Sequence, residues 1–165
     1  MAMTTNARNT VKLTKYSDVI REHAAAAAIT PGCLIEIVPG ADTVRKHATA
    51  GGNVCPIMFA LEDELQGKGL DDDYAAADRV QCWIPGRGDV VYAVLNDGQS
   101  VHEGDKLESA GNGYLTEHVA DVESPGVLTV YPNQIVAIAL EACDCSESSG
   151  GESSGTLEFA KRFKG

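Results

Sequence analysis

The chain has 165 residues, 44% of them hydrophobic, which suits one ordinary domain with a single core. Its 24 acidic and 13 basic side chains give a formal net charge of -11, so binding to nucleic acid or to an anionic membrane surface is disfavoured. No stretch reaches the roughly 18 uninterrupted apolar residues of a membrane span, and no apolar signal-peptide segment follows the N-terminus. We therefore expect a soluble protein made in the cytoplasm.

The first 16 residues are expected to form an extended arm. They are polar and show neither the helical nor the strand period, and Arg8, Lys12 and Lys15 make them net positive. We treat these three side chains as candidate partner-binding residues.

The alanine-rich segment that follows, residues 17–28 (SDVIREHAAAAA), predicts one short helix. Ser17 is a suitable N-cap, alanine has the best helix propensity, and Pro31 and Gly32 would end the helix. The alanine run has no bulky anchor, so an extended segment packed against a neighbour is the alternative. Together with the arm, this segment makes an N-terminal unit of residues 1–32.

From residue 33 onward the pattern is that of short strands separated by turns. Apolar or alternating runs recur with glycine, proline, asparagine and aspartate between them. The expected strands cover residues 33–38, 43–48, 56–61, 79–84, 89–95, 101–107, 114–119, 127–131, 134–141 and 156–163. The most hydrophobic run, 134–141, is expected at the centre. This rhythm predicts an all-β domain over residues 33–165, folded as a barrel or sandwich.

Two long loops interrupt the strands. Residues 62–78 carry seven acidic side chains against the single Lys68, and we expect a mobile, solvated loop in which Asp71, Asp72 and Asp73 are candidate contacts for a basic partner. The alternative of a calcium site lacks the acid spacing of an EF-hand. Residues 146–155 (SESSGGESSG) are low in complexity and predict a flexible insertion.

The five cysteines are an odd number without the spacing of a secreted disulfide framework, so we expect reduced thiols. Cys143 and Cys145 could bind a metal, but no second ligand pair is present, and two packed thiols on one strand face are the alternative. Cys33 and Cys82 lie in apolar strands that favour buried, inert thiols.

No local motif supports a nucleophile that pairs one of the cysteines with a histidine. His47 and His118 stand beside charged residues on alternating strands, where surface positions are expected. The segment 85–89 (PGRGD) is a turn and lacks the order of a phosphate-binding loop. Arg87 at its tip is a further candidate for pairing with a partner carboxylate. We therefore expect no enzymatic activity, no cofactor and no metal.

One segment, residues 89–115, resembles the V-x-x-G-x-x-V-x-x-G-D-x-L rhythm of barrel-sandwich hybrid domains, including biotinyl and lipoyl carriers. In those carriers a modified lysine stands at the tip of a hairpin. Here the tip is Asn96-Asp97-Gly98, without a lysine. A carrier or enzyme module of this type is the alternative function.

A second resemblance covers most of the chain. Five segments, taken in order, resemble capsid decoration (cement) proteins of tailed bacteriophages. They are P-G-x-L-I-E (31–36), T-V-R-K-H-A-T-A-G-G (43–52), F-A-L-E-D-E-L-Q-G-K-G (59–69), Y-A-V-L-x-D-G (92–98) and V-x-x-G-D-x-L-E-S-A-G-x-G (101–113). The resemblance implies a β-rich virion structural protein, often a homotrimer, that is assembled in the host cytoplasm. It also implies that the protein binds the major capsid protein on the outer capsid surface and helps the capsid to resist internal pressure.

Overall fold

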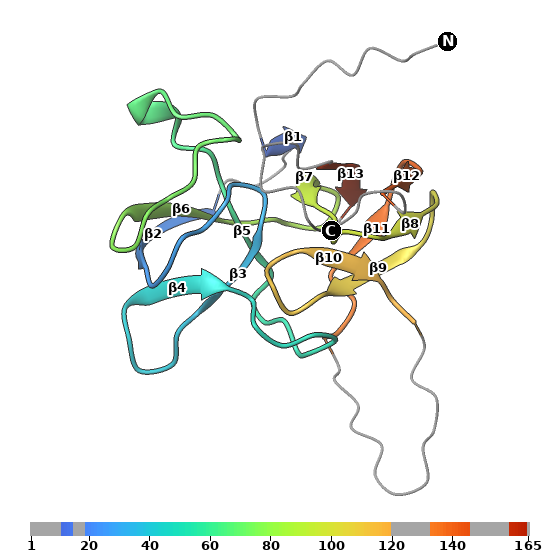
Figure 1. The fold of residues 1–165 in the computed structure, drawn as a ribbon, viewed down its shortest axis with the longest axis horizontal. Helices are drawn as coiled ribbons and strands as arrows, with labels where there is room; N and C mark the ends of the chain where they lie inside the picture. Colours follow the sequence, from blue (N-terminus) through green and yellow to red (C-terminus); the bar gives the residue numbers. More distant parts are fainter. Residues whose placement is uncertain (1–10, 15–18, 120–132, 146–158, 165) are drawn as a thin grey trace, which may run out of the picture.

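The structure is a computed structural model that describes residues 11–14, 19–119, 133–145 and 159–164, the last range through its backbone alone (Figure 1). Within these ranges the protein is all-β, as predicted, with a single turn of 3₁₀ helix, η1 (Glu64–Gln66). The described strands are β1 (Lys12–Thr14), β2 (Val19–Ala25), β3 (Leu34–Ile37), β4 (Thr43–Lys46), β5 (Met58–Ala60), β6 (Arg79–Ile84), β7 (Val90–Val94), β8 (Ser100–Val101), β9 (Lys106–Ser109), β10 (Leu115–Glu117), β11 (Ala137–Ala139), β12 (Cys143–Asp144) and β13 (Phe159–Lys164). None of the described helical residues could form a membrane-spanning helix.

Five strands close into a barrel in the order β2-β4-β3-β5-β6. β3 and β4, which match the strands expected at 33–38 and 43–48, form an antiparallel hairpin, and β3–β5, β5–β6 and β2–β6 are also antiparallel. The barrel closes where the end of β2 runs parallel to the start of β4, with Ala24 opposite Thr43 and Ala25 opposite Val44. Small alanine side chains suit this close approach of two strands.

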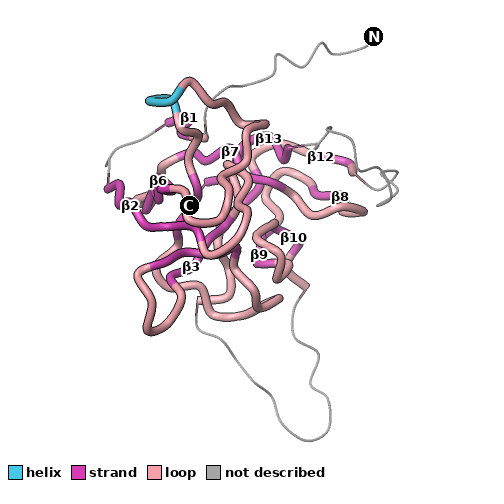
Figure 2. Tube along the Cα trace, turned by 60° about the vertical axis from the view of Figure 1, so that its left-hand side comes forward, coloured by secondary structure: helices cyan, strands magenta, loops and turns pink. Residues whose placement is uncertain are grey.

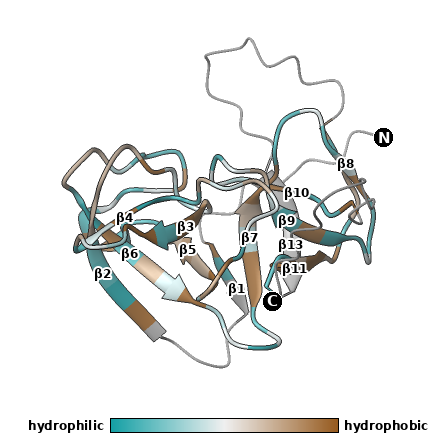
Figure 3. Ribbon diagram, turned by 90° about the horizontal axis from the view of Figure 1, so that it is seen from below, coloured by the Kyte–Doolittle hydropathy of each residue, from teal (hydrophilic) through white to brown (hydrophobic). Residues whose placement is uncertain are grey.

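A six-stranded sheet in the order β1-β7-β13-β11-β9-β10 lies beside the barrel (Figures 1 and 3). The C-terminal strand is inserted between β7 and β11, so the predicted return of the chain after the Ser/Gly segment is confirmed. β11, from the most hydrophobic run, lies inside the sheet as expected. The Ser/Gly segment 146–155 itself and the strand expected at 127–131 lie outside the described residues.

The core has two layers because three barrel strands are buried on both faces. On β3, Ile35 points into the barrel with Met58 and Cys82, while its neighbour Leu34 packs against the six-stranded sheet together with Phe59. Alternate side chains of an extended strand face opposite ways, so one run serves both layers. This explains why β3 and β5 are continuous apolar runs in the sequence.

The helix expected over residues 17–28 is wrong. Residues 19–25 form β2, which pairs with β6 from Val19–Ile84 to Ala24–Arg79. Helix propensity is a weak preference of a few tenths of a kcal/mol per residue, and hydrogen bonding to a neighbouring strand outweighs it here. The segment also lacks the apolar stripe that would anchor a helix, whereas as a strand it buries Ala25 in the barrel.

Two further boundaries differ from the sequence prediction. β1 and β2 are paired with strands of the sheet and the barrel, so the β domain includes residues before position 33. The strand expected at 101–107 is divided into β8, which pairs with β12, and β9. The interruption is a turn in which the His102 N–H donates to the Asp105 carboxylate at 2.7 Å and Gly104 has a φ of +97°.

Candidate interaction surface

The end of the N-terminal arm lies against the start of the acidic loop. The carbonyl of Val11, just before β1, accepts a hydrogen bond from the N–H of Tyr92 at 2.7 Å, which joins the arm to β7. The N–H of Val11 donates to a carboxylate oxygen of Glu62 at 2.9 Å, in a buried position. Glu62 follows β5, so this bond fixes the start of the loop 62–78 beside the end of the arm.

The acidic loop is anchored in the protein interior, contrary to the expectation of a solvated, mobile segment. Leu70 and Tyr74 are buried, and the Tyr74 hydroxyl donates to the Leu61 carbonyl at 2.9 Å. Tyr74 and Ile29 also exchange backbone hydrogen bonds of 2.9 and 3.1 Å. Large apolar side chains among seven acids were the sequence signal, although Leu65, which is also apolar, stays exposed.

One exposed part of the loop is η1, which projects from the same end of the molecule as β1 (Figures 1 and 2). Leu65 is 86% exposed there, next to the exposed Glu64. The backbone around it is fixed, because the Asp63 carbonyl accepts the N–H groups of both Gln66 and Lys68. An apolar side chain is thus held out in solvent on a shaped turn, a feature the sequence analysis missed.

The predicted partner-binding residues lie in separate places. Asp71, Asp72 and Asp73 are exposed on the loop 62–78, where the Asp72 carboxylate accepts the N–H of Gly69 at 2.8 Å. Lys12 lies in β1 opposite Val91 of β7.

Arg87 is exposed in the turn before β7, a turn closed by the N–H of Gly86 donating to the Asp89 carboxylate at 2.7 Å. Arg8 and Lys15 lie outside the described residues. The structure thus brings the first residue of β1 near the start of the acidic loop, whereas Arg87 lies in the turn that precedes β7.

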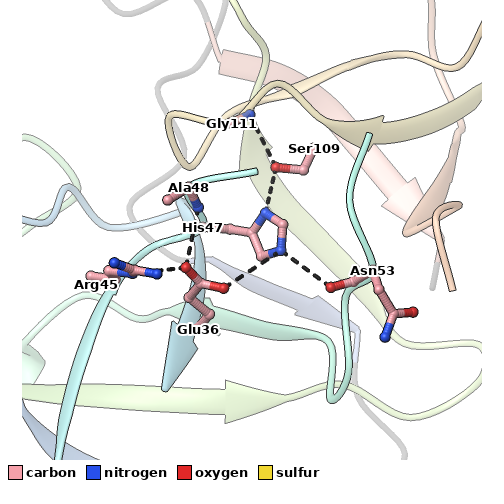
Figure 4. Close-up of polar contacts among 7 residues, drawn as sticks. All are labelled: Glu36, Arg45, His47, Ala48, Asn53, Ser109 and Gly111. Atoms are coloured by element: carbon pink, nitrogen blue, oxygen red, sulfur yellow. Dashed lines mark hydrogen bonds and ion pairs between the residues drawn. The ribbon is translucent and has the colours of Figure 1, made fainter. Parts of the chain in front are cut away.

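A buried polar network joins the barrel to the six-stranded sheet (Figure 4). His47, which follows β4, is 2% exposed, so the surface position expected for it is wrong. Its Nδ1 lies 2.8 Å from the Ser109 hydroxyl at the end of β9, and its Nε2 lies 3.4 Å from the Asn53 carbonyl and 3.7 Å from the Glu36 carboxylate. Ser109 Oγ also accepts the N–H of Gly111 at 3.1 Å.

These contacts define how the protons are arranged. Nε2 faces two acceptors, the Asn53 carbonyl and the Glu36 carboxylate, so Nε2 carries the hydrogen; in the neutral imidazole Nδ1 then accepts from the Ser109 hydroxyl. Carboxylate, imidazole and hydroxyl follow the order of a hydrolase triad. Ser109 is completely buried, however, so its hydroxyl is closed to a substrate and the network acts as a structural joint.

Two thiols are buried in the barrel, and two of the remaining histidines pair with acidic side chains. Cys33 and Cys82 are buried as expected, and burial raises the pKa of each thiol from 9.0 to about 11, which favours the protonated form at neutral pH. His118 pairs with Glu108, and His102 with Asp105. The groups that act on the Cys33 and Cys82 thiols include no histidine side chain.

Cys143 and Cys145 lie side by side with their sulfurs 3.6 Å apart. Among the residues that the structure describes, no group of three histidine, cysteine or acidic side chains could hold a metal ion. The turn at Asn96–Gly98 is tied to the protein body, because the Asn96 N–H donates to the Leu115 carbonyl and the Gly98 N–H to the Cys145 carbonyl. It therefore differs from the freely projecting tip of a carrier domain.

No protein-family model and no curated protein sequence matches this chain. Among solved structures, the chain is similar to the crystal structure of the head fiber gp8.5 N base in bacteriophage phi29, with a TM-score of 0.52. The similarity has 13% sequence identity and covers 90% of this chain and 95% of that chain. It is a likeness of fold that extends over almost the whole of both proteins.

Proposed function

We propose that this protein is a structural component of a bacteriophage virion, which binds the outer surface of the capsid as a decoration protein and stabilises it. The observation that carries the proposal is the fold similarity to a phage head fiber base over 90% of this chain. Fold alone does not determine function. The independent resemblance of five sequence segments to capsid decoration proteins points to the same class of particle.

The proposed partner is the major capsid protein, and the proposed contact is the end of the molecule that carries η1 and β1. Leu65 is the most exposed large apolar side chain of the described residues, and the fixed turn that holds it reduces the ordering cost of binding. The acidic side chains around it would steer the approach to a basic surface. Apolar anchors with charged surroundings are the usual anatomy of a protein interface.

We further propose that the protein acts as a homotrimer on the capsid. Several copies bound together on a symmetric lattice gain avidity without new contacts per copy. Size-exclusion chromatography with light scattering on the purified protein tests this part. A mass of one chain at all concentrations would contradict a preformed trimer and leave assembly on the capsid as the only route.

Co-sedimentation with expanded phage heads that lack this protein tests the main proposal. We expect saturable binding with a fixed number of copies per head. Unexpanded heads serve as the comparison, and an unrelated acidic protein of similar size serves as the negative control. Absence of stoichiometric binding to the expanded heads would overturn the proposed function.

The contact surface is tested separately with Leu65→Ser. A central apolar contact contributes about 2 kcal/mol, so we expect binding to weaken by roughly tenfold or more. Val119→Ser is the matched control, because Val119 is also a highly exposed apolar side chain, at 71%, on another part of the molecule. Equal binding by the two variants would remove Leu65 from the interface without affecting the proposed function itself.

A further inference from the structure

Cys143 and Cys145 form a close thiol pair at the end of β12. Their sulfurs are 3.6 Å apart, and either thiol can donate to the other. Cys143 lies in β12 and Cys145 directly follows the strand; side chains two apart in an extended chain face the same side, which accounts for the contact. All five cysteines lie among the described residues and none is in a disulfide; Cys33 is buried just before β3, Cys82 is buried in β6, and Cys55 is exposed.

The surroundings hold this pair in place. The Cys145 N–H donates to the Gln99 carbonyl at 2.7 Å, and the Gly98 N–H donates to the Cys145 carbonyl at 3.2 Å. Cys143 lies opposite Val101 in the pairing of β12 with β8. Both backbones are therefore fixed while the two sulfurs remain in contact.

The two thiols differ in access. Cys145 is 4% exposed and belongs to the core layer between barrel and sheet, whereas Cys143 is only partly buried against that layer. A reagent from solvent therefore reaches the Cys143 sulfur first, and the Cys145 sulfur is the less accessible neighbour. This is the arrangement of an attacking and a resolving thiol.

We propose that Cys143 and Cys145 are a dithiol site that exchanges with small disulfides, such as oxidised glutathione, to form an intramolecular disulfide. The Cys143 thiolate attacks one sulfur of the small disulfide, whose S–S bond breaks and releases one small thiol, which takes up a proton. The Cys145 sulfur then attacks the Cys143 sulfur of the mixed disulfide and releases the second small thiol. Both cysteines are oxidised, and the small disulfide is reduced to two thiols.

The spacing also sets how stable the product is. Two residues along a strand span about 6.5 Å, near the upper limit of about 6.8 Å for the Cα separation in disulfides. β12 ends at Asp144, so the bond can form with a small change at Cys145, beyond the regular strand. We therefore expect a bond that millimolar small thiols reduce again, and one that fixes the β8–β12 pairing while it lasts.

The test is incubation of the folded full-length protein with oxidised glutathione, followed by alkylation and peptide mass mapping. We expect the peptide with Cys143 and Cys145 to lose two hydrogens, to carry no glutathione and to resist alkylation. Cys55, which is exposed and has no neighbouring thiol in the described contacts, should carry a glutathione adduct in the same sample. Reduction with excess glutathione should restore both alkylation sites.

The matched variant is Cys145→Ser, which keeps the accessible thiol and removes the resolving one. It should retain glutathione on Cys143, whereas the wild-type protein should not. A stable glutathione adduct on Cys143 of the wild-type protein would overturn the proposal, as would free alkylation of both cysteines after oxidation. A disulfide that joins Cys143 to Cys55 in place of Cys145 would overturn it too.

Discussion

The buried carboxylate of Glu62 accepts a hydrogen bond from the backbone N–H of Val11 at 2.9 Å. The two residues are 51 positions apart in the sequence, and each lies at the root of a segment that we assign to partner binding. The bond therefore holds the end of the arm and the start of the acidic loop at one place on the molecule. The net positive arm and the acidic loop therefore meet at this contact.

Glu62→Ala should loosen this junction. The substitution leaves the buried Val11 N–H without its acceptor, which costs about 1–3 kcal/mol in the free energy of unfolding. Glu62→Gln is the matched control, because its amide oxygen can still accept, and it should retain most of the stability. Urea unfolding measures both values, and hydrogen exchange at Val11 reports the local effect. Equal stability of the two variants would show that the bond contributes nothing.

Gly113→Ala should destabilise the contact between the barrel and the β9–β10 loop. Gly113 has a φ of +85°, and an added Cβ would lie 2.8 Å from Lys46 Cβ and 3.2 Å from the Leu34 carbonyl oxygen. Gly40→Ala is the control, since Gly40 has a similar φ of +78° but open space around it.

Both substitutions carry the cost of a left-handed alanine, about 1 kcal/mol, and only Gly113→Ala adds the clash. We therefore expect Gly113→Ala to lower the thermal midpoint more than Gly40→Ala does. A larger loss for Gly40→Ala would contradict the packing described around Gly113.

The local pattern of the sequence determines most of the strands and little of their arrangement. β6 at Arg79–Ile84 matches the alternating run RVQCWI, and Gly and Asp turns end several other strands where expected. The prediction for β2 is wrong because its own residues favour a helix, and only pairing with β6, some 60 positions away, makes the segment a strand. Pairing over such distances leaves no signal within a local window.

The interaction surface shows the same limit. Counting charges in residues 62–78 predicts an acidic loop, and the exposed Asp71–Asp73 agree with it. Tyr74 is buried because Ile29 and Leu61 lie beside it in space, and Leu70 belongs to the same buried cluster as Leu61. The buried His47 depends in the same way on Ser109, 62 positions further along the chain.

Ser109→Ala should weaken the joint between barrel and sheet. Without the hydroxyl, Nδ1 of the buried His47 and the N–H of Gly111 both lose their hydrogen-bond partner. We expect a loss of about 1–3 kcal/mol in the free energy of unfolding. Ser100→Ala, at an exposed position of β8, is the control and should change stability by less than about 0.5 kcal/mol. If urea unfolding gives equal values for both, the network is not a stabilising joint.

Stability should fall in alkaline solution because of buried thiols. Burial raises the pKa of Cys33 from 9.0 to about 11. Below pH 9.0 the thiol is protonated in both the folded and the unfolded chain, so its full contribution is present. Between 9.0 and about 11 the unfolded chain loses a proton that the folded protein retains, and stability drops by up to about 1.4 kcal/mol per pH unit.

Cys33→Ala isolates this effect. The variant should be less stable than the wild-type protein at neutral pH, because it loses buried packing, and the difference between them should shrink as the pH rises from 9.0 to about 11. Cys55→Ala is the control, because it removes a thiol from an exposed position with little buried packing. Urea unfolding across this range measures the differences. A constant difference for Cys33→Ala would mean that the folded protein ionises this thiol as easily as the unfolded chain does.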